Sequence, residues 1–254
     1  MPGPNGLGFQ LYSAREFPPL EARMRLLAEL GYTHVEPYGA LLERRGELEA
    51  ALAATGLKAP TTHVGLDRLR DDLDGTAAEL KALGVETAII PHLRPGDRPT
   101  ESEGWRQLGH ELAALGHRLA GKGLDLAWHN HDFEMAALPD GSRPMDLLLE
   151  AAPRLGWEAD IAWIVRGGQD PVAWLGRHAE RIVALHVKDI MGERGGPEDG
   201  WADIGHGILD WTRLLPAMRA TAARWWVAEH DRPSDADRFA RNSIATFWSW
   251  EAGR

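Results

Sequence analysis

The stretch AWHNHDFEM, residues 127–135, places two histidines, an asparagine, an aspartate and a glutamate in a run that otherwise resembles a buried strand. Imidazole and carboxylate groups bind metal ions and transfer protons, whereas packing alone would favour valine and isoleucine here. Alternate residues of a strand face the same side, so we expect His129 and His131 to point the same way. Glu134 stands where the strand becomes a loop. The stretch is therefore a candidate wall of a functional site.

Other ionisable residues stand at or near the ends of strand-like runs. They are Glu36, His63, His92, Asp160, His186, Lys188 and Glu229. A single histidine at a strand end is more often a hydrogen-bonded packing residue than a ligand. The coincidence over many strands favours a shared site, and a cluster of buried carboxylates requires a cation because an unpaired buried charge is costly.

The elements that would position these residues repeat along the chain. An amphipathic helical stretch ends at a glycine, and an apolar run rich in β-formers follows, in residues 26–39, 52–65, 80–93, 119–132 and 152–165. The glycines at these joints, which we predict to follow helix ends in a left-handed conformation, are Gly31, Gly56, Gly84, Gly123 and Gly156.

Three further strand-like runs, at residues 8–13, 181–190 and 224–231, bring the count to eight. Eight strands, each followed by a helical stretch, predict an α/β protein with a single (β/α)₈ TIM barrel over residues 1–254. A doubly wound open sheet is the alternative, since repetition does not reveal closure. The long segment 191–211 is expected to be a loop at the active end, with Asp210 as the N-cap of the next helix.

Composition limits the classes of function. The chain has no cysteine, so a metal would be held by His, Asp, Glu or water. A net charge of −10 argues against a nucleic-acid partner. The start of the chain lacks the features of a secretion signal, and no apolar run is long enough to span a membrane. We therefore expect a cytoplasmic protein that acts on a small molecule.

The residues alone allow several ligand sets. Asp160, His186 and Glu229 with a carboxylate such as Glu134 would supply three oxygen ligands and one imidazole. Such a set suits one Mn²⁺ or Mg²⁺ ion, with Co²⁺ or Zn²⁺ as alternatives. Asp132 is an alternative fourth ligand, and His129 or His131 could replace either carboxylate.

Five segments carry a resemblance to a known family. In chain order they are AWHNHDFEM, DIAWIVRGGQDPVAWL, ALHVKDI, GHGILDW and WVAEHD. They resemble the sugar phosphate isomerase/epimerase group of the xylose isomerase-like barrels, which includes hydroxypyruvate isomerase, keto-sugar epimerases and inosose dehydratase. The resemblance covers nearly the whole chain and implies a (β/α)₈ fold with one divalent metal. By similarity, the ligands are Glu134, Asp160, His186 and Glu229.

The sequence departs from the family pattern at two places. His206 stands where many relatives carry glutamate, and strand five lacks the usual glutamate pattern at its start. The second departure leaves the fourth ligand, and with it one catalytic base, open.

The implied activity is isomerisation or epimerisation of a keto-sugar or related polyol through a metal-stabilised enediolate. We expect Glu229 as the base, with Glu134 or one of His129 and His131 on the other face. The expected substrate contacts are His63, His92, His131, Lys188 and Glu36. A dehydratase or lyase, a metal-assisted hydrolase and a non-catalytic sugar-binding barrel are the alternatives. Homodimers and homotetramers are common among such barrels.

Overall fold

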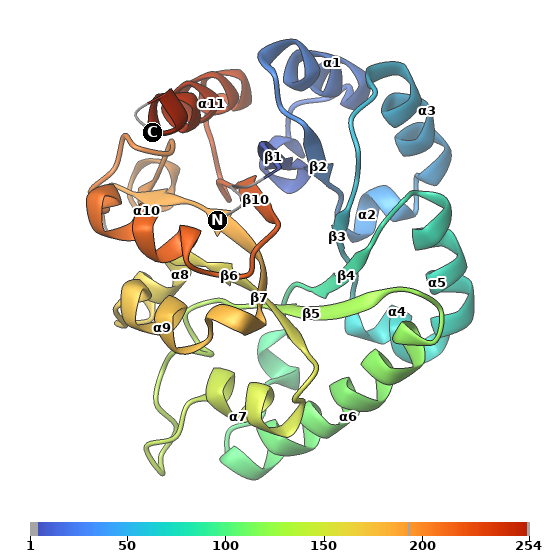
Figure 1. Cartoon of the computed structure of the whole chain (residues 1–254), viewed down its shortest axis with the longest axis vertical. Coiled ribbons are helices and arrows are strands. Elements are labelled where there is room, and N and C mark those ends of the chain that lie inside the picture. The colour runs from blue at the N-terminus through green and yellow to red at the C-terminus, as the bar shows by residue number, and fades with distance from the viewer. Residues whose placement is uncertain (1–4, 193, 253–254) are drawn as a thin grey trace.

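The computed structural model describes residues 5–192 and 194–252, and a barrel of eight parallel strands lies at its centre (Figure 1). These strands are β1 (Leu7–Gln10), β2 (His34–Glu36), β3 (Thr61–His63), β4 (Thr87–Ile90), β5 (Asp125–His129), β6 (Gly156–Asp160), β7 (Ile182–Val187) and β10 (Trp225–Ala228). The predicted TIM-barrel fold is confirmed.

Hydrogen bonding joins the strands in the order β2, β1, β10, β7, β6, β5, β4, β3. Strands β2 and β3 lie at the two ends of this order and are joined by fewer hydrogen bonds than the other neighbours. The connection consists of the bridge of His34 to Lys58 and a 2.8 Å bond from Val35 N to Lys58 O. The His63 amide also donates to Pro37 O at 2.9 Å. The barrel is therefore nearly closed, and its weakest ladder is at this seam.

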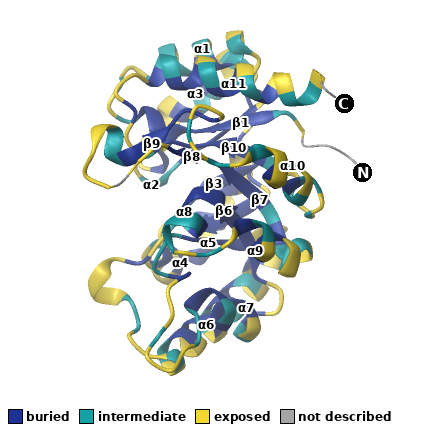
Figure 2. Cartoon of the chain, turned by 90° about the vertical axis from the view of Figure 1, so that its left-hand side faces the viewer, coloured by how far each residue is buried: buried dark blue, intermediate teal, exposed yellow. Residues whose placement is uncertain are grey.

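Helices surround the barrel, and their outer faces carry most of the exposed residues (Figures 1 and 2). The α-helices are α1 (Leu20–Leu30), α2 (Gly39–Leu42), α3 (Arg45–Thr55), α4 (Leu66–Asp71), α5 (Leu73–Ala82), α6 (Ser102–Ala120), α7 (Pro144–Ala151), α8 (Ile161–Arg166), α9 (Pro171–Arg177), α10 (Trp211–Arg219) and α11 (Ala236–Ala252). The 3₁₀ turns are η1 (Leu11–Ala14), η2 (Pro95–Asp97), η3 (Ala179–Arg181) and η4 (Pro197–Gly200). Helix α11 packs beside α1, which brings the two ends of the helical ring together. Within the described residues, no helix is both long and apolar enough to cross a membrane.

Four of the five predicted joint glycines have a left-handed backbone. Their φ angles are +89° at Gly31, +71° at Gly56, +79° at Gly84 and +78° at Gly123. The prediction for Gly156 is wrong, because this residue begins β6. Its role is close packing, since a Cβ there would lie 3.1 Å from the methyl groups of Val183.

A second close approach lies between β1 and the start of β2, away from the carboxyl ends of the strands. The ring of His34 is buried against the face of Gly8, where an added Cβ would lie 2.3 Å from two ring atoms. The same imidazole packs edge-on against Trp225, with ring centroids 5.0 Å apart. Glycine at position 8 therefore makes room for a histidine inside the barrel wall.

The long segment after β7 is more ordered than a simple loop. Strand β8 (Asp189–Ile190) pairs antiparallel with β9 (Trp201–Ala202). The carboxylate of Asp189 accepts bonds from the amides of Gly205, Gly207 and Leu209 and from the Trp211 indole. The predicted N-cap is confirmed, because Asp210 accepts from the amide of Thr212 at the start of α10.

Candidate metal centre and substrate pocket

The carboxyl ends of β5, β6, β7 and β10 bring together His129, Asp160, His186 and Glu229, which we call the first cluster. Their ligand-type atoms all lie within 4.8 Å of one another, and the four residues are buried. The Nε2 atom of His129 lies 3.0 Å from Nδ1 of His186 and 3.6 Å from Oδ2 of Asp160. Nδ1 of His186 also lies 2.9 Å from Oε2 of Glu229.

The first cluster fits a divalent cation. Oδ1 of Asp160 accepts from the amide of Trp163 at 2.8 Å and caps α8, whereas Oδ2 is buried without a hydrogen-bond partner and has only an ion pair with Lys188 at 3.5 Å. A buried carboxylate oxygen in this position is stabilised by a cation at closer range. Two imidazoles and two carboxylates converging on such an atom are a donor set for Zn²⁺, Mn²⁺ or a similar ion.

The local charges favour the ligand form at His129, Asp160 and Glu229, but not at His186. Burial alone would lower the pKa of His186, but Glu158 and Glu229 raise it well above its usual value, so a metal ion would have to displace a proton from this ring. Burial lowers the pKa of His129 to about 3, so that ring is neutral. Burial alone would raise the pKa of Glu229, but Lys188 and His186 hold it well below its usual range. Burial raises the pKa of Asp160 to about 6, against the opposing charge of Lys188. At neutral pH the cluster therefore offers a neutral His129 and two carboxylates.

Lys188 is an internal counter-charge of the first cluster. Its amine lies 3.5 Å from Oδ2 of Asp160, 3.0 Å from Oε2 of Glu229 and 2.6 Å from Oδ2 of Asp231. It also lies 4.2 Å from the ring centroid of Trp201. Burial alone would lower the pKa of Lys188, but Asp231 and Glu229 raise it above its usual value. The side chain has no exposed surface, so the structure does not place this predicted substrate contact in a pocket.

A second cluster, formed by Glu36, His63 and Glu158, faces the other nitrogen of His186. Nε2 of His186 lies 2.8 Å from Oε1 of Glu36 and 3.2 Å from Oε2 of Glu158. When a metal ion takes the place of the Nδ1 proton, these carboxylates can accept the Nε2 proton of His186 and fix the orientation of the ring.

Sequence reasoning missed Glu158, although it precedes Asp160 by two residues. The period of a strand gives the two positions the same facing, and this signal could have found it. Glu36, predicted as a substrate contact, has no exposed surface. Burial alone would lower the pKa of His63, but Glu36 and Glu158 raise it to about 9.

A pocket of about 400 Å³ opens beside both clusters. Its walls are Tyr12, Tyr38, Gly39, His63, Gly65, Pro91, His92, His129, His131, Glu229 and Asp231. The predicted contacts His63, His92 and His131 lie on this wall. Sequence reasoning missed Tyr12, Tyr38 and Asp231, although Asp231 follows Glu229 by two residues.

The structure does not bring Glu134 to either cluster or to the pocket wall. Its carboxylate accepts from the indole of Trp128 at 3.1 Å and from the amide of His131 at 2.8 Å. Burial raises the pKa of Glu134 to about 8. We therefore correct its predicted place, because the turn after β5 directs the side chain back onto its own backbone. Asp132, the alternative ligand, forms an ion pair with Arg194 instead.

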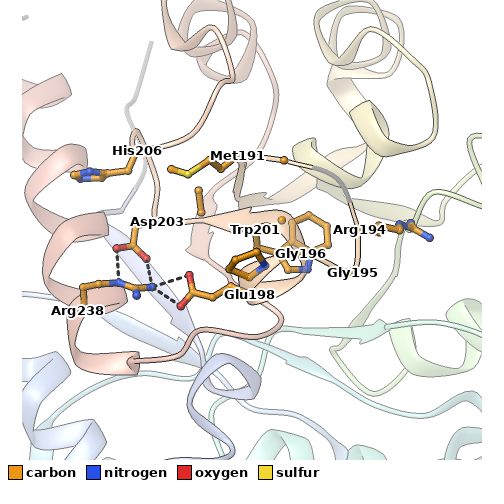
Figure 3. A pocket seen from close by; sticks show the side chains of 13 residues that line it. Met191, Arg194, Gly195, Gly196, Glu198, Trp201, Asp203, His206 and Arg238 are labelled. Carbon is orange, nitrogen blue, oxygen red and sulfur yellow. Dashed lines mark hydrogen bonds and ion pairs between the residues drawn. The ribbon is translucent and has the colours of Figure 1, made fainter.

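A separate hollow of about 700 Å³ lies along the segment after β7 (Figure 3). Glu198 and Asp203 on its wall are both bonded to Arg238. His206 is exposed on this hollow rather than among the clusters. Among the described residues, the groups of His, Asp and Glu that could hold a metal ion lie at the strand ends and not on this hollow.

Comparison with known proteins agrees with this architecture. A sequence profile described as the xylose isomerase-like TIM barrel matches residues 24–248. The rhizopine catabolism protein MocC of Rhizobium meliloti is 31% identical over 146 residues, covering 51% of this chain and 44% of the relative. An inosose dehydratase of Geobacillus kaustophilus is 27% identical over 188 residues, covering 65% of this chain and 60% of the relative. The chain thus spans about half the length of these curated relatives.

Among solved structures, the IolI protein with a bound zinc atom superimposes with a TM-score of 0.77. The two chains are 16% identical, and the match covers 96% of this chain and 97% of the other. At this identity, the likeness shows a common fold.

Proposed function

Because the chain belongs to the xylose isomerase-like TIM barrel family, we propose that it is a divalent-metal-dependent enzyme acting on a keto-sugar or keto-cyclitol. The reaction begins with removal of a proton from the carbon beside the ketone. Return of a proton to the neighbouring carbon gives isomerisation, and its return to the opposite face of the same carbon gives epimerisation. The observation that carries this proposal is the first cluster, in which the buried Oδ2 of Asp160 has no hydrogen-bond partner beside an open pocket.

The metal that we propose is Zn²⁺ or Mn²⁺. In the first cluster, His129 stands in the place that the sequence analysis gave to Glu134. The ligand set is therefore two carboxylates and two imidazoles, instead of three carboxylates and one imidazole. Imidazole ligands make Mg²⁺ a poorer fit than the sequence alone indicated. The zinc atom in the IolI protein supports the same choice.

When bound, the metal would polarise the substrate ketone and stabilise the negative charge that develops on its oxygen. Glu229 lies on the pocket wall and is held ionised by Lys188, so it is the base in this proposal. His131 occupies the pocket wall and replaces Glu134 as the group on the opposite face. Tyr12 and Tyr38, with ring centroids 5.3 Å apart, offer hydroxyls and an apolar surface to a sugar ring.

The pocket favours a substrate without a phosphate group. Its wall contains neither arginine nor lysine among the described residues. The nearby guanidinium of Arg15 stacks on Tyr12 and donates to the carbonyls of Tyr12 and Asp231. A phosphate would therefore meet carboxylates and tyrosines rather than a free cation.

Dehydration is a second candidate for the step after proton removal. Asp231 lies on the pocket wall, and burial raises its pKa to about 6 despite its ion pair with Lys188. A carboxyl group with such a pKa can protonate a departing hydroxyl near neutral pH. The similarity to an inosose dehydratase supports this candidate.

Deuterium exchange tests the proposal. The Mn²⁺-loaded protein would be incubated in D₂O with ketoses, keto-inositols and 3-keto-sugars, each with and without phosphate, and followed by NMR. We expect metal-dependent loss of one C–H signal beside the ketone, absent in Glu229→Gln and retained in Glu134→Gln. An added alkene or enone signal would identify dehydration. Protein that binds the metal but exchanges no proton across the panel would contradict the proposal.

A further inference from the structure

The second cluster has the arrangement of a cation site in its own right. We propose that Glu36, His63 and Glu158 bind a second divalent cation, in addition to the metal of the proposed reaction. The residues of this site come from β2, β3 and β6 and meet across the barrel interior, where they face Nε2 of His186 from the first cluster.

The donor atoms of the second cluster form a closed ring with His186. Nε2 of His63 lies 3.1 Å from Oε1 of Glu36 and 2.8 Å from Oε2 of Glu158. Nε2 of His186 lies 2.8 Å and 3.2 Å from the same two oxygens. Nitrogen and oxygen atoms thus alternate at separations close to those between neighbouring ligands of one small divalent ion.

Protons on the two histidines do not give every contact in this ring a hydrogen bond. Each Nε2 atom carries at most one proton, yet each faces two carboxylate oxygens. In addition, Oε2 of Glu36 and Oε1 of Glu158 are buried without a hydrogen-bond partner. These two unpartnered oxygens are observations separate from the ring, and both would be relieved by a cation that the carboxylates share.

Gln10 contacts one side of the second cluster. Oε1 of Gln10 accepts from the amide of Tyr12 at 3.0 Å, which fixes the direction of the side-chain amide. Its Nε2 atom then donates to Oε1 of Glu36 at 2.7 Å and approaches Nδ1 of His63 to 3.5 Å. Gln10 therefore bonds the same oxygen of Glu36 that faces the two histidines, and Oε2 of Glu36 stays without a partner.

Charge balance points the same way. Four buried carboxylates, Glu36, Glu158, Asp160 and Glu229, share the interior with a single buried lysine, Lys188, among the described residues. Asp231 beside Lys188 adds a further negative charge. Protons on His63 and His186 or divalent cations can offset these carboxylates, and a second divalent cation would take the place of the proton on His63.

Two carboxylates and one imidazole suit Mn²⁺ or Zn²⁺. Access is available through His63, which also lies on the pocket wall. The second cation would therefore lie within reach of the cavity that receives the substrate.

Equilibrium titration tests the second site. Chelator-treated protein is titrated with Mn²⁺, and free Mn²⁺ is counted from its EPR signal. We expect two Mn²⁺ per chain in the wild type, one in Glu158→Gln and two in Glu134→Gln, the matched control in which a buried carboxyl outside both clusters is changed. His63→Asn, expected to bind one, serves if Glu158→Gln does not fold. Asp160→Asn should also bind one, through the second cluster alone.

A single Mn²⁺ in the wild type overturns the second site, as does a Glu158→Gln protein that keeps two. Bound Mn²⁺ provides an independent readout, because two neighbouring ions broaden each other's EPR lines. We expect broadened lines in the loaded wild type and sharp lines in Glu158→Gln. Wild-type protein that binds one Mn²⁺ and still catalyses deuterium exchange would remove this site and leave the proposed reaction standing.

Discussion

The amine of Lys188 lies 3.0 Å from Oε2 of Glu229, in an interior where the lysine has no exposed surface. The lysine charge stabilises the ionised glutamate but repels any cation held by the same carboxylate. We therefore expect Lys188→Met to bind Mn²⁺ more tightly, by roughly tenfold for a change of about 1.4 kcal/mol. Deuterium exchange should become slower, because Glu229 loses the group that orients it. Mn²⁺ titration together with NMR exchange rates checks both effects, and weaker Mn²⁺ binding would contradict this account of Lys188.

The two oxygens of Asp160 have different tasks, and Asp160→Asn separates them. The remaining oxygen can still accept from the amide of Trp163, so we expect the free energy of unfolding of the metal-free protein to change by less than about 1 kcal/mol. The affinity of the first cluster for Mn²⁺ should fall by more than roughly 100-fold. Urea unfolding and Mn²⁺ titration measure the two quantities. A folded variant with wild-type affinity at both sites would exclude Asp160 as a ligand.

Gly8→Ala tests the packing of His34 in the barrel wall. The added methyl would meet the imidazole, and overpacking of this kind costs about 1–3 kcal/mol of unfolding free energy. Urea unfolding measures the cost, and the same substitution in a His34→Ala background should cost less. An equal cost in both backgrounds would mean that the imidazole is not the obstacle.

His34 also predicts a pH dependence of stability. Burial lowers its pKa to about 4, while Glu36 opposes this shift. Between the unfolded value of about 6.5 and the folded value, the unfolded chain holds a proton that the folded protein does not. The contribution of neutral His34 is therefore fully present above the unfolded pKa and is lost as pH falls toward 4, by up to about 3 kcal/mol.

The comparison of wild type with His34→Gln isolates this contribution. Urea unfolding at intervals from pH 4 to pH 7 should show a smaller loss of stability at low pH in the variant. Identical slopes in the two proteins would contradict a depressed pKa at His34.

The fold could be predicted from the sequence more completely than the candidate site. Helix ends at Gly31 and Gly56 and the apolar runs after them are local signals, so the eight-strand repeat predicts the barrel. Gly156 shares the same local pattern but begins a strand, because what decides its role is contact with Val183 on the neighbouring strand. A local pattern does not distinguish a flexible backbone from a tight contact.

The candidate ligands show the same limit. Asp160 and Glu229 lie at the carboxyl ends of strands. The alternation of side chains along a strand and the barrel geometry together predict that they lie close to one another. Glu134 lies beyond the end of β5, and its direction is set by hydrogen bonds to Trp128 and the His131 backbone rather than by any period. Glu158 could have been predicted, because it lies two residues before Asp160 in β6 and alternate residues of a strand face the same side.

The narrow ladder between β2 and β3 gives the barrel a preferred line of opening. The other neighbouring strands are joined by ladders of three or more paired residues, with a register shift between β6 and β7, whereas this seam depends on the bridge from His34 to Lys58 and a few neighbouring bonds. We therefore expect the backbone amide protons of β2 and β3 to exchange with solvent faster than those of the other barrel strands. Tyr38 follows β2 and His63 ends β3, and both line the pocket. The side of the barrel that we expect to open most easily therefore borders the pocket that we propose for the substrate.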